Sequence, residues 1–281
     1  MLGLEVIILI VLGLIWMLVA SIEDLTTHEV SDWLNYSFVI AVLGFRFFWS
    51  LFSFQGFWFF YWGLIGFCLF FLLGNLFYYS RMFGGGDAKL MYGLGAILPL
   101  SLVFSINLKA FLSFIFVFFL VGAIYGLFGS FVLMFANWKK FRKEFFFQIE
   151  KSGKMILFVM VFSLVVMGFG FFMGELFYLG GLLVLMAFLF IFSKAIDQSA
   201  MIRKRRVSLL REGDWLYRDV KVGSKVVKSD WEGLSKEEIK LLNKKGGKVL
   251  VREGLAYVPV FLISFIVWLF LINSELWYSF W

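Results

Sequence analysis

The chain has 281 residues, of which 62% are apolar and 22% are aromatic, and its formal net charge is +7. Water-soluble domains are about half apolar, so a soluble fold would expose far too much of this surface. One cysteine, Cys68, excludes an intrachain disulfide and a cysteine-rich metal cluster, and we expect it to be a buried hydrophobe. The composition predicts an integral membrane protein.

Apolar runs predict eight membrane spans, because a bilayer core needs about 20 apolar residues per helix. The predicted spans are 4–22, 33–50, 57–80, 90–106, 109–136, 154–173, 176–194 and 255–273. The first run lacks a basic flank, so it is interpreted as a retained helix and not as a signal peptide. The fourth span is short and is interrupted at Pro99, and the sixth and seventh are close enough to form a hairpin.

The expected fold class is an all-α polytopic membrane protein with a small α+β cytoplasmic module. Its predicted parts are a membrane core (1–136), a basic cytoplasmic loop (137–153), a helical hairpin (154–194), a small soluble module (195–254) and a C-terminal transmembrane helix (255–281).

Local patterns predict strands and a helix inside the soluble module. Apolar and polar residues alternate over 208–227, which is typical of short strands, and 248–255 predicts another strand. Ser235 and Glu238 have the spacing of a capping box, so a helix should begin there and run to about Lys244.

Charge predicts the orientation in the membrane. With the N-terminus outside, 24 of the 26 Lys and Arg residues fall on the inner side, in loops or, for Lys154 and Lys194, at the bordering ends of predicted spans. The positive-inside rule therefore predicts a multi-pass plasma-membrane protein whose basic loops are cytoplasmic. These loops, including the basic run 203–206, would contact anionic lipid headgroups and not nucleic acid.

Two carboxylates, Asp24 and Asp87, each follow an apolar run, and two predicted spans separate them. They should therefore lie on the same, cytoplasmic side. An ionisable residue at a membrane edge indicates a functional site. Of two adjacent carboxyl groups, one keeps its proton, so the pair can activate water and polarise a peptide carbonyl without a cofactor or metal ion. The alternative is that each aspartate only caps a helix.

Two motifs resemble those of the GxGD aspartic membrane proteases of the prepilin peptidase type. The first is Asp24-Leu25-Thr26-Thr27-His28-Glu29-Val30-Ser31-Asp32, with Ser31 where that family commonly has Pro. The second is Gly84-Gly85-Gly86-Asp87-Ala88-Lys89-Leu90. The resemblance covers about the first 105 residues and is greatest to archaeal preflagellin and prepilin peptidases. It implies that Asp24 and Asp87 are catalytic and that the 154–194 hairpin is an addition to a six-helix core.

The resemblance also implies the substrate, a pilin-like or archaellin-like precursor that is cut between a short basic leader and an apolar helix. Glu23, Glu29 and Asp32 lie in a segment without Lys or Arg, so they would attract a basic leader. The alternative for these three residues is an ordinary solvated loop.

Residues of the second motif have possible roles beside Asp87. Gly84 and Gly86 lack side chains, which would leave a bare backbone surface for a substrate strand. Lys89 either positions Asp87 or the substrate, or anchors a helix end in the membrane interface.

A competing hypothesis is a non-enzymatic carrier or assembly scaffold whose aspartates bind protons or cations. Transporter sites usually lie near the middle of the bilayer. The two aspartates are predicted at one edge, which favours the protease.

Overall fold

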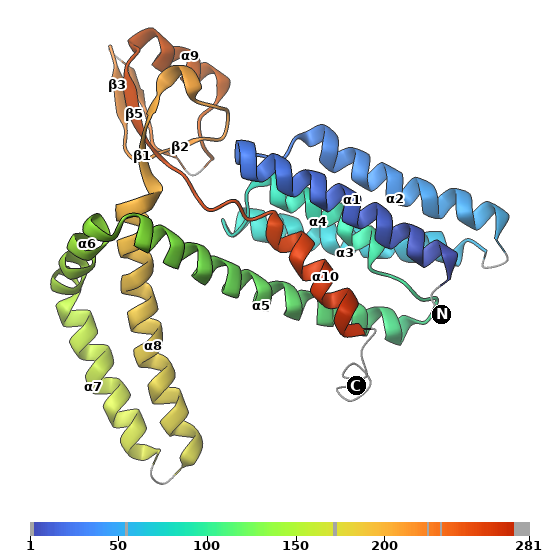
Figure 1. The fold of residues 1–281 in the computed structure, drawn as a ribbon, viewed down its shortest axis with the longest axis horizontal. Coiled ribbons are helices and arrows are strands. Elements are labelled where there is room, and N and C mark those ends of the chain that lie inside the picture. Colours follow the sequence, from blue (N-terminus) through green and yellow to red (C-terminus); the bar gives the residue numbers. More distant parts are fainter. Residues whose placement is uncertain (1–2, 54–55, 171–172, 224, 231, 273–281) are drawn as a thin grey trace. The chain divides into compact units, whose positions relative to one another are not determined.

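The computed structural model is a polytopic helical membrane protein with a small strand-containing module (Figure 1). It describes residues 3–53, 56–170, 173–223, 225–230 and 232–272. The chain divides into two compact units, Met1–Gly126 with Ala256–Trp281, and Leu127–Leu255.

Helices from both ends of the chain build the first unit. In its described part these are α1 (Leu4–Thr27), α2 (Asp32–Phe52), α3 (Trp58–Tyr79), α4 (Gly85–Ile97), most of α5 (Phe104–Ala136) and α10 (Pro259–Ile272). α10 packs beside α1, so the last described helix completes the bundle that the first one begins.

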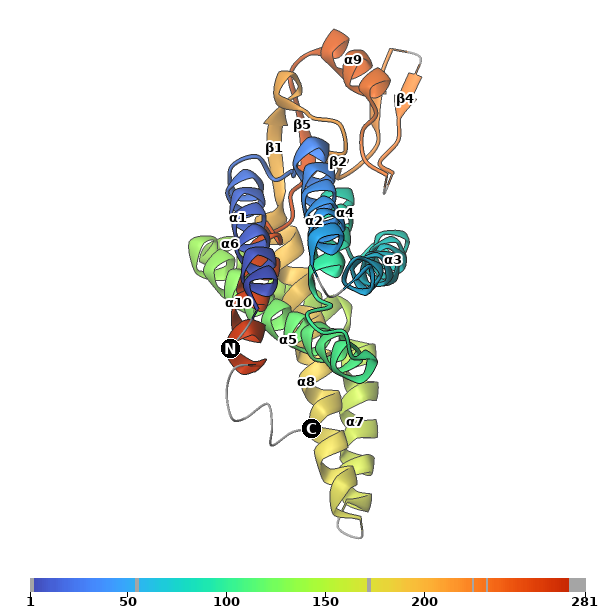
Figure 2. The same cartoon turned by 90° about the vertical axis from the view of Figure 1, so that its right-hand side faces the viewer.

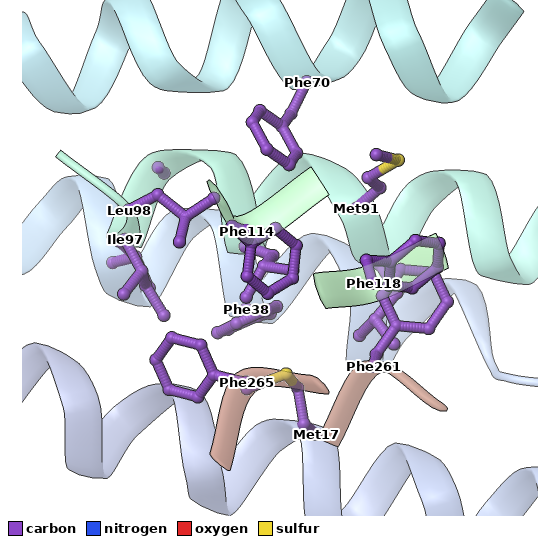
Figure 3. Packing of buried hydrophobic residues seen from close by; sticks show 14 of the residues in the cluster. Met17, Phe38, Phe70, Met91, Ile97, Leu98, Phe114, Phe118, Phe261 and Phe265 are labelled. Atoms are coloured by element: carbon purple, nitrogen blue, oxygen red, sulfur yellow. The ribbon is translucent and has the colours of Figure 1, made fainter. Parts of the chain in front are cut away.

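The short helix α4 forms the core of this unit, because it packs against α1, α2 and α3 (Figures 1 and 2). Leu90, Leu94 and Ile97 of α4 have no exposed surface. Figure 3 shows Met91 and Phe70 among the buried side chains of the same cluster. From Gly93 to its end at Ile97, every residue of α4 is buried within the protein.

Glycines allow α3 and α4 to approach closely. A Cβ atom on Gly66 would lie 2.2 Å from the carbonyl oxygen of Gly95, and one on Gly95 would lie 2.5 Å from the carbonyl oxygen of Gly66. Small residues at such contacts are typical of membrane helices, which associate through close backbone packing.

Arg46 of α2 is completely buried at the far end of α4. The last carbonyl groups of a helix lack partners within it, and Pro99 has no N–H with which to continue the ladder. The guanidinium donates to the carbonyl oxygens of Ile97, at 3.1 Å, and of Pro99, and to that of Phe59 at 2.7 Å. A cation at this end also complements the helix dipole. Arg46 therefore fixes the end of α4 to both α2 and α3.

Two expectations for this unit are wrong. The fourth span, predicted over 90–106, is not one helix, because α4 ends at Ile97 and α5 begins at Phe104. Cys68, expected to be buried, is exposed on α3. In a membrane protein a small apolar side chain is stable on the lipid-facing surface as well as in the core.

A helical hairpin was predicted over 154–194, which lies in the second unit. α7 (Gly153–Phe169) packs against α8 (Gly174–Ile196), and the Ser163 hydroxyl donates to the carbonyl oxygen of Gly180 at 2.7 Å. The basic stretch 137–153 is mostly a helix, α6 (Trp138–Lys151), instead of the predicted loop. Its apolar side packs on α8, with 5.6 Å between the ring centroids of Phe141 and Phe192.

The described residues of the module that follows α8 form eight short elements. They are the π-helix η1 (Asp197–Met201), β1 (Ile202–Arg206), the 3-10 helix η2 (Val207–Leu209), β2 (Trp215–Leu216), β3 (Val220–Val222), β4 (Lys225–Val227), α9 (Lys236–Lys245) and β5 (Lys248–Arg252). β1 and β2 both pair antiparallel with the central strand β5, and β3 and β4 form a hairpin. The predicted strands and helix are confirmed, and Ser235 Oγ accepts from the Glu238 N–H at 3.3 Å.

Strand β1 was not predicted, because its basic sequence suggested a segment on the lipid surface. Arg205 in this strand pairs with Asp214 at 3.2 Å and with Glu253 at 3.3 Å. Arg205 therefore forms ion pairs with carboxylates within the module.

Five helices among the described residues, α1, α2, α3, α5 and α8, are long and apolar enough to cross a membrane. The number rises to six if α6 and α7, which meet at a 72° bend, are one span. Eight spans were predicted because apolar composition alone does not show that α4, α7 and the described part of α10 have only 13, 17 and 14 residues.

We predict that Arg46→Met destabilises the first unit. The substitution keeps much of the side-chain volume but leaves the carbonyl groups of Ile97 and Pro99 without donors. The free energy of unfolding in detergent should fall by about 3 kcal/mol. Arg218→Met, at an exposed position of the module, is the control and should change it by less than about 0.5 kcal/mol. Unfolding of Arg46→Met at the wild-type denaturant concentration would contradict this role.

Candidate active site

Asp24 lies in the last turn of α1, and only 6% of its surface is exposed. Its Oδ2 atom accepts a hydrogen bond from the backbone N–H of Val258 at 2.9 Å. Val258 directly precedes α10, so this contact joins the end of α1 to the start of a helix more than two hundred residues later. A buried carboxylate needs such donors, and the contact fixes the direction in which Asp24 points.

Asp87 is the third residue of α4 and is half-buried. Its Oδ2 atom accepts from the backbone N–H of Gly84 at 3.1 Å, so it caps the start of its own helix. Asp87 precedes Leu90, where the apolar part of α4 begins, and lies outside the membrane-spanning helices. Burial, followed by the negative charge of Asp24, raises the pKa of Asp87 to about 7, and the Gly84 hydrogen bond opposes the rise.

The structure therefore places the two predicted aspartates near enough for the charge of Asp24 to act on Asp87. Two tyrosines share this environment: Tyr125 of α5 interacts with Asp24, and Tyr257 interacts with Asp87. The Tyr125 hydroxyl donates to the carbonyl oxygen of Ala256 at 2.9 Å, which holds the segment before α10 against α5. The Tyr257 hydroxyl lies over Gly122, where a Cβ atom would approach it to 2.2 Å.

Sequence reasoning missed Tyr125, Tyr257 and Val258. Their contribution depends on α5 and on the segment before α10 packing against α1 and α4. An aromatic residue near the end of an apolar run is also common in membrane proteins, so the sequence holds no signal that would separate these tyrosines from the many others.

The predicted acidic residues of the first motif make contacts within the chain. The Asp32 carboxylate forms an ion pair with Lys89 of the second motif. Glu23 accepts from the backbone N–H and the hydroxyl of Ser31, at 3.1 and 3.2 Å, and so closes the turn between α1 and α2. Glu29 is exposed in that turn. The structure thus links the two motifs directly through Asp32 and Lys89.

The glycines of the second motif differ in their surroundings. Added Cβ atoms would lie 3.4 Å from Asp87 Oδ2 at Gly84, and 3.9 Å from Tyr78 at Gly85. At Gly86 the nearest atom is the Cβ of Val30, at 3.4 Å. One side of Gly86 is therefore covered by the turn between α1 and α2, and the expected bare surface is restricted to Gly84 and Gly85.

Among the described residues, no group of three or more His, Cys, Asp or Glu side chains is placed to hold a metal ion. The chemistry that this arrangement offers is that of a coupled carboxyl pair. One group can hold a proton near neutral pH while the other is ionised.

Comparison with known proteins connects this geometry to a family. The model of the type IV leader peptidase family matches residues 11–135, a stretch that contains both aspartates and both motifs. Over this stretch, which is less than half of the chain, the sequence is similar to the type IV leader peptidase family. No solved structure matches the chain significantly.

Two relatives of this family are similar over part of their length. A preflagellin peptidase of Methanocaldococcus jannaschii is 37% identical over 89 residues, which cover 32% of this chain and 37% of that protein. A preflagellin peptidase of Methanococcus maripaludis is 29% identical over 135 residues, which cover 45% of this chain and 57% of that protein. The matches thus span less than two thirds of either relative, and they confirm the resemblance to preflagellin peptidases.

The coupling of the two carboxyl groups can be tested by titration. Asp24→Asn removes one cause of the raised pKa of Asp87, so that pKa should fall, yet stay above the ordinary value of about 3.9 because burial is the larger cause. Carbon NMR of 13C-labelled aspartate, with Asp87 assigned from Asp87→Asn, measures both values. Asp219→Asn in the soluble module is the control and should leave the pKa of Asp87 unchanged. An unchanged pKa in Asp24→Asn would show that the pair does not interact.

Proposed function

We propose that this protein is a membrane-embedded aspartic endopeptidase. It removes the short basic leader from pilin-like or archaellin-like precursors at the cytoplasmic edge of the plasma membrane. The observation that carries the proposal is the electrostatic contact of Asp24 with Asp87, at the ends of two helices within the stretch that matches the leader peptidase family. The names of the two relatives support the class of substrate.

The proposed reaction begins with Asp87 protonated and Asp24 ionised. Asp24 takes a proton from a water molecule as the water oxygen attacks the peptide carbonyl carbon, and Asp87 gives its proton to the carbonyl oxygen. The product of this step is a tetrahedral diol. When the C–N bond breaks, Asp24 gives its proton to the leaving nitrogen, and one diol hydroxyl returns a proton to Asp87. Both carboxyl groups end in their starting states, so no metal ion or cofactor takes part.

Substrate recognition in this proposal combines lipid and charge. The apolar helix of the precursor stays in the bilayer, which places the leader boundary at the membrane edge. Glu23, beside Asp24 in α1, and Glu29, in the turn after α1, attract the basic leader. Asp32 contributes less to this attraction, because Lys89 offsets its charge.

The proposal predicts that each aspartate is required for cleavage. Purified protein in lipid vesicles should cut a peptide made of a basic leader and an apolar helix. Asp24→Ala and Asp87→Ala should each lower the rate by at least about 10³-fold. Asp219→Ala, a matched change on the exposed surface of the module, should leave the rate unchanged. Wild-type activity in either active-site variant, with folding verified by thermal unfolding, would refute the proposal.

A further inference from the structure

The first turn of α2 contacts the second motif at two points. Lys89 forms its ion pair with Asp32, and the Asn35 amide Nδ2 donates to the carbonyl oxygen of Gly86 at 3.4 Å. Residues three apart on a helix lie on one face, so Asp32 and Asn35 present both groups to α4 together. Their partners, Gly86 and Lys89, lie on either side of Asp87 in the sequence.

We propose that Asp32 and Asn35 form a clamp that positions Asp87 for reaction with its partner carboxyl group and with substrate. They are positioning residues, since they act through α4. The inference rests on the proposed function and deepens it, because it assigns a role to Asn35 and changes that of Asp32 from attracting the leader to aligning Asp87.

Asn35 is the more informative of the two residues. It has no exposed surface, and its Oδ1 atom has no hydrogen-bond partner among the described residues. A buried amide with one unpaired atom costs stability compared with an apolar side chain of similar size. Packing alone would therefore favour leucine at this position. The contact of the Asn35 amide with Gly86, the residue before Asp87, gives a reason for an amide here.

The ion pair of Lys89 and Asp32 also affects the orientation of α4 more than it affects the stability of the fold. The Asp32 side chain is 64% exposed and that of Lys89 28%, and ion pairs with such exposure add little to stability. The ammonium group lies 5.7 Å from the ring centroid of Tyr36, one turn further along α2. Lys89 therefore rests along the first turn of α2, which fixes the rotation of the start of α4 about its axis.

If Asn35 serves to align Asp87, replacing it should lower the rate of cleavage without lowering the stability of the protein. Asn35→Leu removes the unpaired oxygen, so its thermal unfolding temperature should equal or exceed that of the wild type. Its kcat for leader cleavage should nevertheless fall about 10²-fold, since small displacements of reacting groups have effects of this size. KM should stay within about twofold, because the clamp does not touch the substrate.

Asn107→Leu is the matched control for this variant. Asn107 is equally buried, but both ends of its amide bond to the backbone of Ser101, at 3.1 and 2.8 Å. Its replacement removes these two hydrogen bonds to the Ser101 backbone, so the unfolding temperature should fall while kcat stays at the wild-type value. The two substitutions should thus show opposite patterns of stability and rate.

The ion pair is tested by a double-mutant cycle. Lys89→Met and Asp32→Asn should each lower kcat about tenfold, and the combined variant should lose no more than either alone, as expected for residues that act through one contact. Lys89→Arg keeps a positive charge that can pair with Asp32, so it should retain most of the wild-type rate. Lys236→Met breaks an exposed pair with Glu212 in the module and should have no effect.

The outcomes separate this inference from the proposed function. An active wild type with unchanged kcat in Asn35→Leu overturns the clamp alone. A raised KM with unchanged kcat also overturns it, since the residues would then bind substrate. A folded wild type that cleaves no precursor overturns the proposed function and, with it, the clamp.

Discussion

Two carboxyl groups placed together where water is scarce cannot both be ionised at low cost, and the first unit is arranged around this constraint. Burial raises the pKa of Asp87, and repulsion from the charge of Asp24, which grows as the local dielectric constant falls, raises it further. Asp87 therefore retains a proton at a pH where an exposed aspartate would lose it. Both groups are also held by backbone donors, Asp24 by Val258 and Asp87 by Gly84. Without these donors the carboxylates would be free to turn apart into water.

The short helix α4 connects Asp87 to the rest of the unit. A helix of 13 residues is about 20 Å long, whereas a bilayer core is about 30 Å thick. α4 is therefore too short to reach from one surface of such a core to the other. Arg46 satisfies the carbonyl groups at the far end, and the Gly66–Gly95 contact fixes the middle against α3. With the α2 contacts at the near end, α4 is held along its whole length, which favours a fixed position for Asp87.

The sequence predicted the features that depend on local pattern. The apolar runs predicted α1, α2, α3, α5 and α8, the described helices that are long and apolar enough to cross a membrane. The Ser235–Glu238 spacing predicted the start of α9. The failures have physical causes. Pro99 hinted at a short α4, but its length depends on where Arg46 can satisfy the helix end. α6 was taken for a loop because its basic residues obscured the apolar side that packs on α8.

The remaining site residues could not have been predicted because their roles depend on distant contacts. Val258 and Asp24 are separated by 234 positions, and Asn35 and Gly86 by 51. Asn35 carried one local signal, since it is an amide within an apolar run, but only packing against α4 shows what the amide contacts. Asp32 looked like part of an acidic surface because its partner, Lys89, belongs to the other motif.

The pH dependence of kcat/KM for leader cleavage tests most directly whether Asp24 and Asp87 work as a coupled acid and base. The profile should be bell-shaped, since the reaction needs one carboxyl group protonated and the other ionised. The alkaline limb should have its midpoint near pH 7, where Asp87 loses its proton, and the acid limb should appear as Asp24 becomes protonated. A rate that stays constant from pH 5 to pH 9, measured on folded protein in vesicles, would contradict the account.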